Sequence, residues 1–307
     1  MSHNRLSPPP VAAKTWQGEA FVFGLSLIEA AFPLFAMFTV TALGAIHAYF
    51  YSLIIATILL AVWVVLRKKT SELHFRHAYK NLALTSLFIT TLFSLVFIAL
   101  QYTTPSHVMI ILFLQVLFSY LFLGRRSQET LPKVHLAGVF LMTLGAMIIL
   151  FPSDLKINPG DYLVLLAAMI APIANLYQKR ARQQVSSETI LFVRSLIALP
   201  FLYVLALFLE PSPSWQAIQT QWLWLFLTGF LVFIVAKLMW IEALHRLPIT
   251  KVNALFAFSP LLTILLVYLF LDQSPAWIQL FGALPIVIGS ILLTRAISPA
   301  PTQQNSN

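Results

Sequence analysis

Three ionisable side chains interrupt long apolar stretches of the chain: Glu29, Arg194 and Lys237. An ionised group near the centre of a bilayer costs about 2.5–3.5 kcal/mol on insertion scales, so it is retained where a partner or a function compensates. A carboxyl at Glu29 can take up a proton on one side of a membrane and release it on the other. The planar guanidinium of Arg194 suits paired hydrogen bonds to a carboxylate or phosphate. These residues are our candidates for proton coupling and anion binding.

Each of these candidates, and two buried amides, also has a structural interpretation. Glu29 can be held neutral or paired permanently with Arg194 or Lys237, and Arg194 can extend to the lipid headgroups. Asn175 and Gln115 are expected in the bundle interior, where an amide either binds a solute or bridges neighbouring helices. The sequence leaves both interpretations open.

One tryptophan and three prolines complete the candidate site. Trp240 lies one turn after Lys237, which favours a place along the pathway, although tryptophan is common in the interfacial belt. Pro33, Pro172 and Pro260 lie inside predicted helices, where each removes one helical hydrogen bond and leaves a carbonyl that can face a cavity. A simple packing kink is the alternative, because proline is frequent in membrane helices.

These residues need long apolar helices to hold them. The 307-residue chain is 59% hydrophobic and only 9% charged, whereas a soluble domain is about 25% charged. Its apolar runs are about 17–25 residues long, the length with which a helix crosses the hydrocarbon layer. They do not alternate as barrel strands do. We predict an all-α integral membrane protein with ten transmembrane helices near residues 20–42, 46–66, 80–100, 107–123, 134–151, 161–177, 189–209, 221–243, 250–271 and 277–294.

Lys and Arg residues fall almost entirely on alternate connections between these helices. Lys156 is the only one on the other side, while Arg194 and Lys237 lie within spans. Because basic connections stay in the cytoplasm, both termini are predicted to be cytoplasmic. The turns and anionic lipid headgroups account for the net charge of +9 without a nucleic-acid partner. The basic residues on the predicted cytoplasmic side are Arg5, Lys14, Arg67, Lys68, Lys69, Arg76, Lys80, Arg125, Arg126, Lys133, Lys179, Arg180, Arg182, Arg246, Lys251 and Arg295.

The two halves of the chain share a pattern. Tyr-Leu-Phe-Leu occurs at residues 120–123 and again at 268–271, and downstream two glycines seven residues apart follow in each half. The glycines predict close helix packing, with dimerisation as an alternative. Since five helices per half is an odd number, the second half must be inverted in the membrane. We predict an N-terminal tail at 1–19, repeats at 20–151 and 161–297, a linker at 152–160 and a C-terminal tail at 298–307.

Four segments carry a resemblance to a known family: ALQYTTPSHV, EALHRLPITKVNAL, FSPLLTILLVYLFL and GALPIVIGSILL. With the five-plus-five layout, they make residues 20–297 resemble the EamA-type ten-helix members of the drug/metabolite transporter superfamily. The resemblance implies an exporter or exchanger of small metabolites. The chain departs from the family at Gly124-Arg125 and Asp272-Gln273, where members usually carry Gly-Glu, and the fourth span lacks the usual proline. Members typically have an uncharged residue where this chain has Lys237, which makes Lys237 a candidate for selectivity.

Inverted repeats are frequent in secondary transporters, whose site lies near the bilayer midplane between the repeats. We therefore predict a secondary active transporter that exports or exchanges a small polar metabolite, such as an amino acid or organic acid, by alternating access. Proton coupling and a homodimer are options. The alternatives are an organic-anion, phosphate-ester or nucleotide-conjugate exchanger, and a membrane scaffold that does not transport. The short connections favour a bacterial cytoplasmic membrane, with an organellar membrane as the alternative.

Motifs for other functions are missing from the sequence. It has no cysteine, no Walker pattern, no HExxH and no GxSxG. These absences argue against thiolate metal sites, ATP hydrolysis and the common hydrolase mechanisms. We expect neither an enzyme nor a cofactor or metal site, and expect gradients or exchange to supply the energy.

Overall fold

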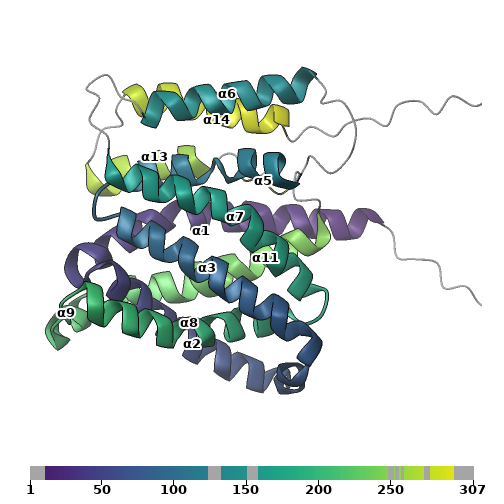
Figure 1. Ribbon diagram of the computed structural model, residues 1–307, viewed down its shortest axis with the longest axis vertical. Helices are drawn as coiled ribbons and strands as arrows, with labels where there is room; N and C mark the ends of the chain where they lie inside the picture. The colour runs from purple at the N-terminus through teal and green to yellow at the C-terminus, as the bar shows by residue number, and fades with distance from the viewer. Residues whose placement is uncertain are drawn as a thin grey trace, which may run out of the picture.

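The computed structural model describes residues 11–123, 133–150, 158–247, 252, 256, 259–272 and 277–293. Within these residues the chain is helical and contains no strand (Figure 1). The elements are α1 (Val11–Leu43), α2 (Ala45–Leu66), η1 (Thr70–His74), η2 (Arg76–Ala78), α3 (Tyr79–Ala99), α4 (Pro105–Leu112), α5 (Gln115–Leu123), α6 (Lys133–Leu150), α7 (Pro159–Arg182), α8 (Ser187–Leu209), α9 (Trp215–Thr220), α10 (Trp222–Leu227), η4 (Thr228–Ala236), α11 (Lys237–Arg246), α13 (Ser259–Leu271) and α14 (Trp277–Leu293).

Seven helical segments in the described part of the chain are long and apolar enough to cross a membrane. They are α1, α2, α3, the run from α4 to α5, α7, α8 and the run from α10 to α11. Three shorter apolar helices lie at Leu136–Gly145, Ser259–Leu271 and Leu280–Leu292. The chain is thus a multi-pass membrane protein, as predicted, and the count of ten spans stays a prediction.

The fourth predicted span is broken in its middle. Leu114 donates its backbone N–H to the carbonyl of Ile111, and Val116 donates to Phe113, so the chain tightens to three-residue hydrogen bonds between α4 and α5. The sequence carries no proline here that would have indicated the break. Its effect is to start a new helix at Gln115.

The eighth predicted span contains a π-helix, η4, between α10 and α11. Its Gly229 packs so closely on α2 that a Cβ atom would lie 2.6 Å from the carbonyl oxygen of Ser52. A π-helical turn is wider than an α-helical one and is frequently found at functional sites. Lys237 is the first residue after this segment, so the π-helix sets the direction in which α11 presents it.

The helices are arranged in layers (Figure 1). The pair α6–α14 forms one edge of the bundle and the pair α2–α8 lies toward the other, with α1, α3, α7 and α11 between them. The most extensive contacts are α6 with α14, α3 with α7, α2 with α8 and α1 with α11, and each joins the first half of the chain to the second. The interior between the two halves is therefore where side chains from both can meet.

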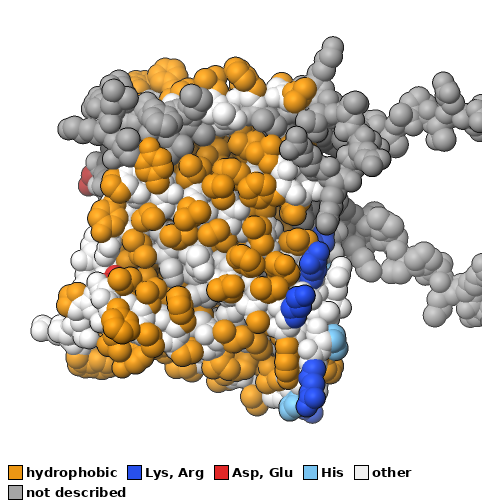
Figure 2. Space-filling view, in the orientation of Figure 1, with side chains coloured by type: hydrophobic (Ala, Val, Ile, Leu, Met, Phe, Trp, Pro, Cys, Tyr) orange, Lys and Arg blue, Asp and Glu red, His pale blue; other side chains and the backbone are white. Residues whose placement is uncertain are grey.

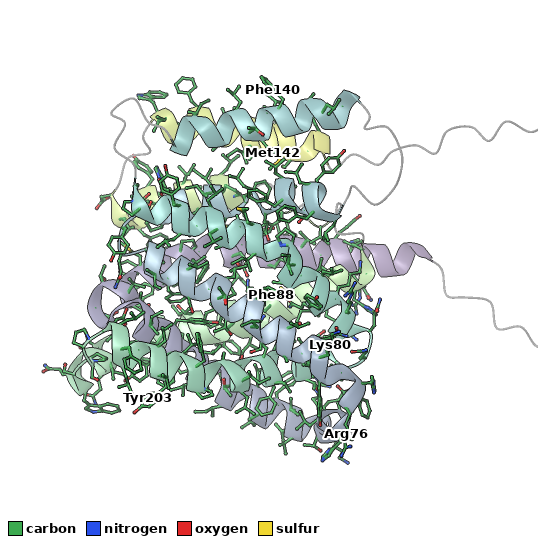
Figure 3. All side chains as sticks on the ribbon, in the orientation of Figure 1. Arg76, Lys80, Phe88, Phe140, Met142 and Tyr203 are labelled. Carbon is green, nitrogen blue, oxygen red and sulfur yellow. The ribbon has the colours of Figure 1, made fainter. Side chains whose placement is uncertain are left out.

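The described start of α1 and the end of α14 lie at the same end of the bundle (Figure 1). Lys and Arg side chains on the visible face gather at this end (Figure 2), where Arg76 and Lys80 are labelled in Figure 3. The rest of that face is dominated by apolar side chains, as a lipid-facing surface requires. We refer to this end as the basic end.

Four glycines form the contact between α6 and α14. A Cβ atom at Gly145 would lie 2.5 Å from the carbonyl oxygen of Gly282, and one at Gly289 would lie 2.7 Å from that of Gly138. The first glycine of each helix thus faces the second glycine of the other, so the two helices cross antiparallel at backbone contact. These glycines serve packing within one chain, and dimerisation is not needed to explain them.

Replacing Gly289 with leucine should separate α6 from α14. The new side chain would meet the backbone of Gly138 and the Met142 side chain, so we expect a loss of about 1–3 kcal/mol of stability, typical of overpacking. Thermal unfolding of the purified protein in detergent measures this loss. The control is Ile288→Leu on the exposed face of α14, which should leave the melting temperature unchanged. Equal melting of both variants would contradict the glycine contact.

Candidate functional site

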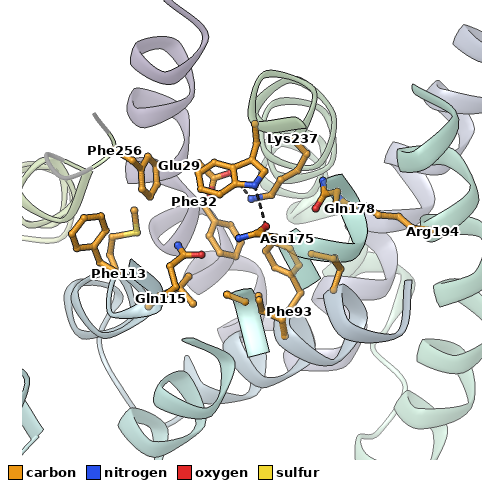
Figure 4. A pocket seen from close by; sticks show the side chains of 16 residues that line it. Glu29, Phe32, Phe93, Phe113, Gln115, Asn175, Gln178, Arg194, Lys237 and Phe256 are labelled. Atoms are coloured by element: carbon orange, nitrogen blue, oxygen red, sulfur yellow. Dashed lines mark hydrogen bonds and ion pairs between the residues drawn. The ribbon is translucent and has the colours of Figure 1, made fainter. Parts of the chain in front are cut away.

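A cavity lies at the centre of the bundle, between the two halves of the chain (Figure 4). Its volume is about 60 Å³, room for about four water molecules, so a larger solute requires side chains to move. The polar residues singled out from the sequence all line this cavity: Glu29, Gln115, Asn175, Arg194, Lys237 and Trp240. They come from α1, α5, α7, α8 and α11, so only the tertiary fold brings them together.

Glu29 and Lys237 form an ion pair across the cavity. The Lys237 Nζ donates to Glu29 Oε1 at 2.5 Å, and the side chains are only 14% and 9% exposed. The same ammonium lies 5.0 Å from the centroid of the Phe93 ring, close enough for a cation–π contact. Of the two partners that the sequence left open for Glu29, the structure selects Lys237. The pair joins α1 of the first half to α11 of the second.

Arg194 is a buried cation rather than an anchor at the headgroups. It is 4% exposed, and its Nη1 has no hydrogen-bond partner among the described residues. Its position in α8 is fixed by Ser86 of α3, which donates its hydroxyl to the Arg194 carbonyl at 2.8 Å. Electrostatic interaction links the guanidinium to Glu29 and to Lys237. With all three groups ionised, the charged residues that line the cavity sum to +1.

Two candidate amides occupy different places in the wall. The Asn175 Oδ1 accepts a hydrogen bond of 3.1 Å from the indole Nε1 of Trp240, so this amide both lines the cavity and bridges α7 to α11. The indole ring also packs edge-on against Phe256 at 5.6 Å between centroids. Gln115 is the first residue of α5 and is presented to the cavity by the break between α4 and α5.

The three candidate prolines differ in their positions. Pro33 and Pro172 lie inside α1 and α7, and the residue before each lines the cavity. Each removes the amide that would bond four residues back, to the carbonyls of Glu29 and Ala168. Pro260 is the second described residue of α13, and the two residues that precede Ser259 lie outside the described part of the chain. The role of Pro260 as a helix break therefore stays a prediction.

The structure adds cavity residues that the sequence analysis had not named. Gln178 is 1% exposed and follows Asn175 by three positions, so both amides lie on one face of α7. The three-residue spacing from Asn175 could have identified Gln178 from the sequence. The aromatic residues Phe93, Phe113 and Phe256 also line the wall. The sequence alone gives no feature that distinguishes these three from the other phenylalanines of the chain.

At the end of the bundle opposite the basic end, two acids bind the starts of helices. Glu210 accepts from the backbone N–H of His47 and lies 3.1 Å from its Nδ1, at the start of α2. Asp161 accepts from the Thr103 hydroxyl at 2.5 Å and lies 3.1 Å from Nδ1 of His107. His47 and His107 are thus each paired with a carboxylate from the other half.

Glu242 holds three elements together at the basic end. It pairs with Arg246 on its own helix, and it also accepts from Arg182 Nε at 2.9 Å and from the Ser187 hydroxyl. This carboxylate ties α11 to the ends of α7 and α8 and closes the bundle there.

A second carboxylate at this end, Glu72 in η1, binds the start of α8. It accepts hydrogen bonds from the backbone N–H and hydroxyl of Ser186, from Thr189 and from Lys69. Burial alone would raise its pKa, but these hydrogen bonds outweigh burial and lower the pKa from 4.5 to about 2. Glu72 is therefore ionised at neutral pH and fixes the short connection between α2 and α3.

The side chains at the central site are suited to recognise a polar solute. No group of three His, Asp or Glu side chains in the described part of the chain converges as a metal site would need. The cavity offers one carboxylate, two cations, three amides and aromatic walls. Such a set can bind a small polar or anionic solute and exchange a proton.

Comparison with known proteins agrees with this architecture. A family model described as the EamA-like transporter family matches residues 16–151 and 158–295. The chain belongs to the EamA-like transporter family. This confirms the resemblance found in the sequence, and the family's relatives are named transporters rather than enzymes.

Two relatives of this EamA-like chain carry the name uncharacterized transporter. One, from Synechocystis sp., is 22% identical over 209 residues, which are 64% of this chain and 60% of the relative, so the alignment spans less than two thirds of that protein. The other, from Archaeoglobus fulgidus, is 26% identical over 281 residues, 88% of this chain and 94% of the relative. A solved crystal structure aligns with a TM-score of 0.66 at 20% identity over 92% of this chain and 96% of that one. That likeness shows a shared fold.

Replacing one partner of the central ion pair should cost more stability than replacing both partners. Glu29→Gln leaves the Lys237 ammonium buried without a counter-charge, and we expect a loss on the order of 3 kcal/mol. The double variant Glu29→Gln with Lys237→Met should recover most of that loss. A double-mutant cycle of melting temperatures in detergent measures the coupling. Additive effects of the two changes would show that the two groups do not interact.

The hydrogen bonds at Glu72 predict a pH dependence of stability. Because the folded-state pKa is lowered to about 2, the contribution is complete above the unfolded value of 4.5 and is lost as the pH falls toward 2. Wild type should therefore melt above Glu72→Gln by a constant margin from pH 8 to about pH 6, and that margin should shrink by about pH 3. A difference in melting temperature that stays constant down to about pH 3 would show that ionised Glu72 does not stabilise the fold.

Proposed function

We propose that this EamA-like protein is a secondary active transporter that moves a small polar metabolite through the central cavity by alternating access. The observation that carries the proposal is the Glu29–Lys237 ion pair beside Arg194 in a buried cavity between the halves. Ionisable groups inside a membrane protein are costly and mark substrate or proton pathways. Here three of them, from three helices, line one cavity.

We further propose ten spans in two inverted five-helix repeats, residues 20–151 and 161–297. The helix contacts support this arrangement, because α1 packs on α11 and α13 while α7 packs in the same way on α3 and on α4 with α5. The glycine contact supports it too, since Gly145 meets Gly282 as Gly289 meets Gly138. Reciprocal contacts of this kind are what a two-fold axis generates. An axis in the membrane plane gives antiparallel partners.

The orientation belongs to the same proposal. The described start of α1 and the end of α14 share the basic end of the bundle. Basic connections are retained in the cytoplasm, so we place this end and both termini there. The short connections fit a bacterial cytoplasmic membrane, which is the compartment we propose.

Charge balance in the cavity favours coupling between a proton and an anion. Ionised Glu29 leaves a net charge of +1, and a proton on Glu29 raises it to +2, which strengthens the attraction of an anion. By linkage, a bound anion strengthens proton binding to Glu29 by the same factor. The two ligands therefore bind cooperatively, and a conformational change that exposes the cavity on the other side releases both. Glu29 is the coupling group in this scheme, with Lys237 as its counter-charge.

The ion pairs at the two ends are suited to act as alternating closures. Glu242 with Arg182 holds the basic end, while Glu210 with His47 and Asp161 with its partners hold the other. Each links elements from different parts of the bundle, so opening one end requires its contacts to break. A permanently closed scaffold would keep both sets intact, and it would move no solute.

Vesicles reconstituted with the purified protein test this proposal. They are loaded with a mixture of organic acids and amino acids, and the solutes that leave are identified by mass spectrometry with and without a pH gradient. We expect one solute class to leave only with the protein, and faster with the gradient. Loss of every protein-dependent flux would leave the scaffold interpretation.

The coupling role is tested with Glu29→Gln in the same vesicles. A glutamine cannot exchange a proton, so the flux should lose its dependence on the pH gradient while solute exchange at equal pH persists. The matched control is Glu188→Gln in the first turn of α8, outside the cavity. A pH-gradient dependence that survives in Glu29→Gln would remove the coupling role and leave transport itself intact.

A further inference from the structure

The polar groups of the cavity are divided into two sets, and this division carries an inference that rests on the proposed function. Glu29 bonds with Lys237, and Asn175 bonds with Trp240, so these four side chains use polar groups on one another. Arg194 Nη1 and Gln178 Nε2 are buried and have no hydrogen-bond partner among the described residues. Both residues line the cavity, and Figure 4 shows them next to each other at one side of it. We refer to this pair as the donor corner.

The donor corner demands an acceptor. A guanidinium has only N–H groups, and the nitrogen of a primary amide donates and does not accept. Buried donors are almost always satisfied in folded proteins, and those that are not call for a ligand or another explanation. Because one of the two donors is charged, an anionic oxygen satisfies the corner better than a neutral one. A cationic group placed here would leave the donors unpaired and face the charge of Arg194.

While Glu29 is ionised, the charge of the cavity selects a monoanion over a dianion. Lys237 is already compensated by Glu29, so Arg194 carries the only uncompensated charge among the residues that line the cavity. A carboxylate matches that single charge, whereas the dianion of a phosphate ester would leave a buried negative charge. A free amino acid fits poorly as well, because its ammonium would have to compete with Lys237 for Glu29.

The wall away from the donor corner is apolar and aromatic. Phe113, Phe256 and Trp240 line it, with ring centroids 6.1 Å apart for Phe113 and Phe256 and 5.6 Å apart for Trp240 and Phe256. In Figure 4 the two phenylalanines lie across the cavity from Arg194 and Gln178. A solute with an apolar body at one end and an acceptor at the other would satisfy both sides at once.

We propose that the transported solute is an amphipathic organic monocarboxylate, bound with its carboxylate at Arg194 and Gln178 and its apolar body toward Phe113, Phe256 and Trp240. The small volume of the described cavity means that this body displaces aromatic side chains as it enters. Gln178 becomes a binding residue alongside Arg194.

Three probes of matched shape test this class: phenylacetate, phenylacetamide and 2-phenylethylamine, which present an anion, a neutral amide and a cation. Binding is measured as the rise in melting temperature of the purified wild-type protein in detergent at pH 7. We expect phenylacetate to raise the melting temperature. Phenylacetamide should bind with an apparent affinity at least about tenfold lower, and 2-phenylethylamine should have no effect. Equal stabilisation by phenylacetate and phenylacetamide would overturn the proposal. The proposal would also be overturned if phenylacetate and two smaller monocarboxylates, isovalerate and acetate, all failed to raise the melting temperature.

The variant Gln178→Glu gives a test that does not depend on a damaged fold. The substitution keeps the size of the side chain and supplies Arg194 with an internal carboxylate. The melting temperature without ligand should therefore rise, and the response to phenylacetate should disappear. Arg194→Gln should also lose the response, while the control Arg180→Gln, an exposed arginine outside the cavity, should keep it. A full response to phenylacetate in Gln178→Glu would overturn the donor corner.

These binding measurements separate the inference from the proposed function. Carboxylate binding at the donor corner without flux in vesicles would support the donor corner as a binding site and would contradict the transport proposal. Protein-dependent flux without a preference for solutes that carry a carboxylate would support transport and would contradict the role of the donor corner.

Discussion

The constraint on which the structure depends is the cost of placing ionised groups where lipid excludes water. An isolated charge in such surroundings is tolerated only when another group or a ligand compensates it. Glu29 and Lys237 compensate each other, whereas Arg194 has no carboxylate partner of its own among the described residues. The bundle therefore stores an imbalance of one positive charge at its centre. An uncompensated cation in a cavity is costly for a scaffold, but it is useful for a protein that must bind and release an anion.

The distribution of charge between the two halves makes this imbalance sensitive to movement. Glu29 belongs to α1, in the first half, while Lys237 and Arg194 belong to α11 and α8, in the second. A displacement of α1 relative to α11 changes the distance between Glu29 and Lys237, and with it the field at Arg194. Carboxylates join the halves at both ends as well: Glu210 with α2 and Asp161 with α4 at the end opposite the basic end, and Glu72 with the start of α8 at the basic end. In the proposed transport cycle, conformation, protonation and anion binding all depend on contacts between the two halves.

The sequence predicted the helical class and six of the residues around the cavity: five because a charge or amide within an apolar run stands out against its surroundings, and Trp240 because it follows Lys237 by one turn. It left open whether Glu29 pairs with Arg194 or with Lys237, since these residues are far apart along the chain and only the fold decides which of them meet. It missed the break before Gln115 and the π-helix before Lys237, because no proline marks the first and Gly229 alone does not identify the second. Such backbone details arise from packing between helices, and a single sequence records packing only weakly.

The backbone irregularities and the site chemistry are connected. Gln115 opens a new helix, Lys237 follows the π-helix, and Pro33 removes the amide that would bond to the carbonyl of Glu29. Regular helices would keep these residues at the spacing and direction that an α-helix imposes. Three of the polar groups at the cavity therefore sit where the helical hydrogen-bond pattern is interrupted. Interruptions of this kind are tolerated at membrane depth where the backbone is buried in protein or lines a cavity, which is the position that all three occupy. The geometry of the site follows from departures from ideal helix as much as from the identity of its side chains.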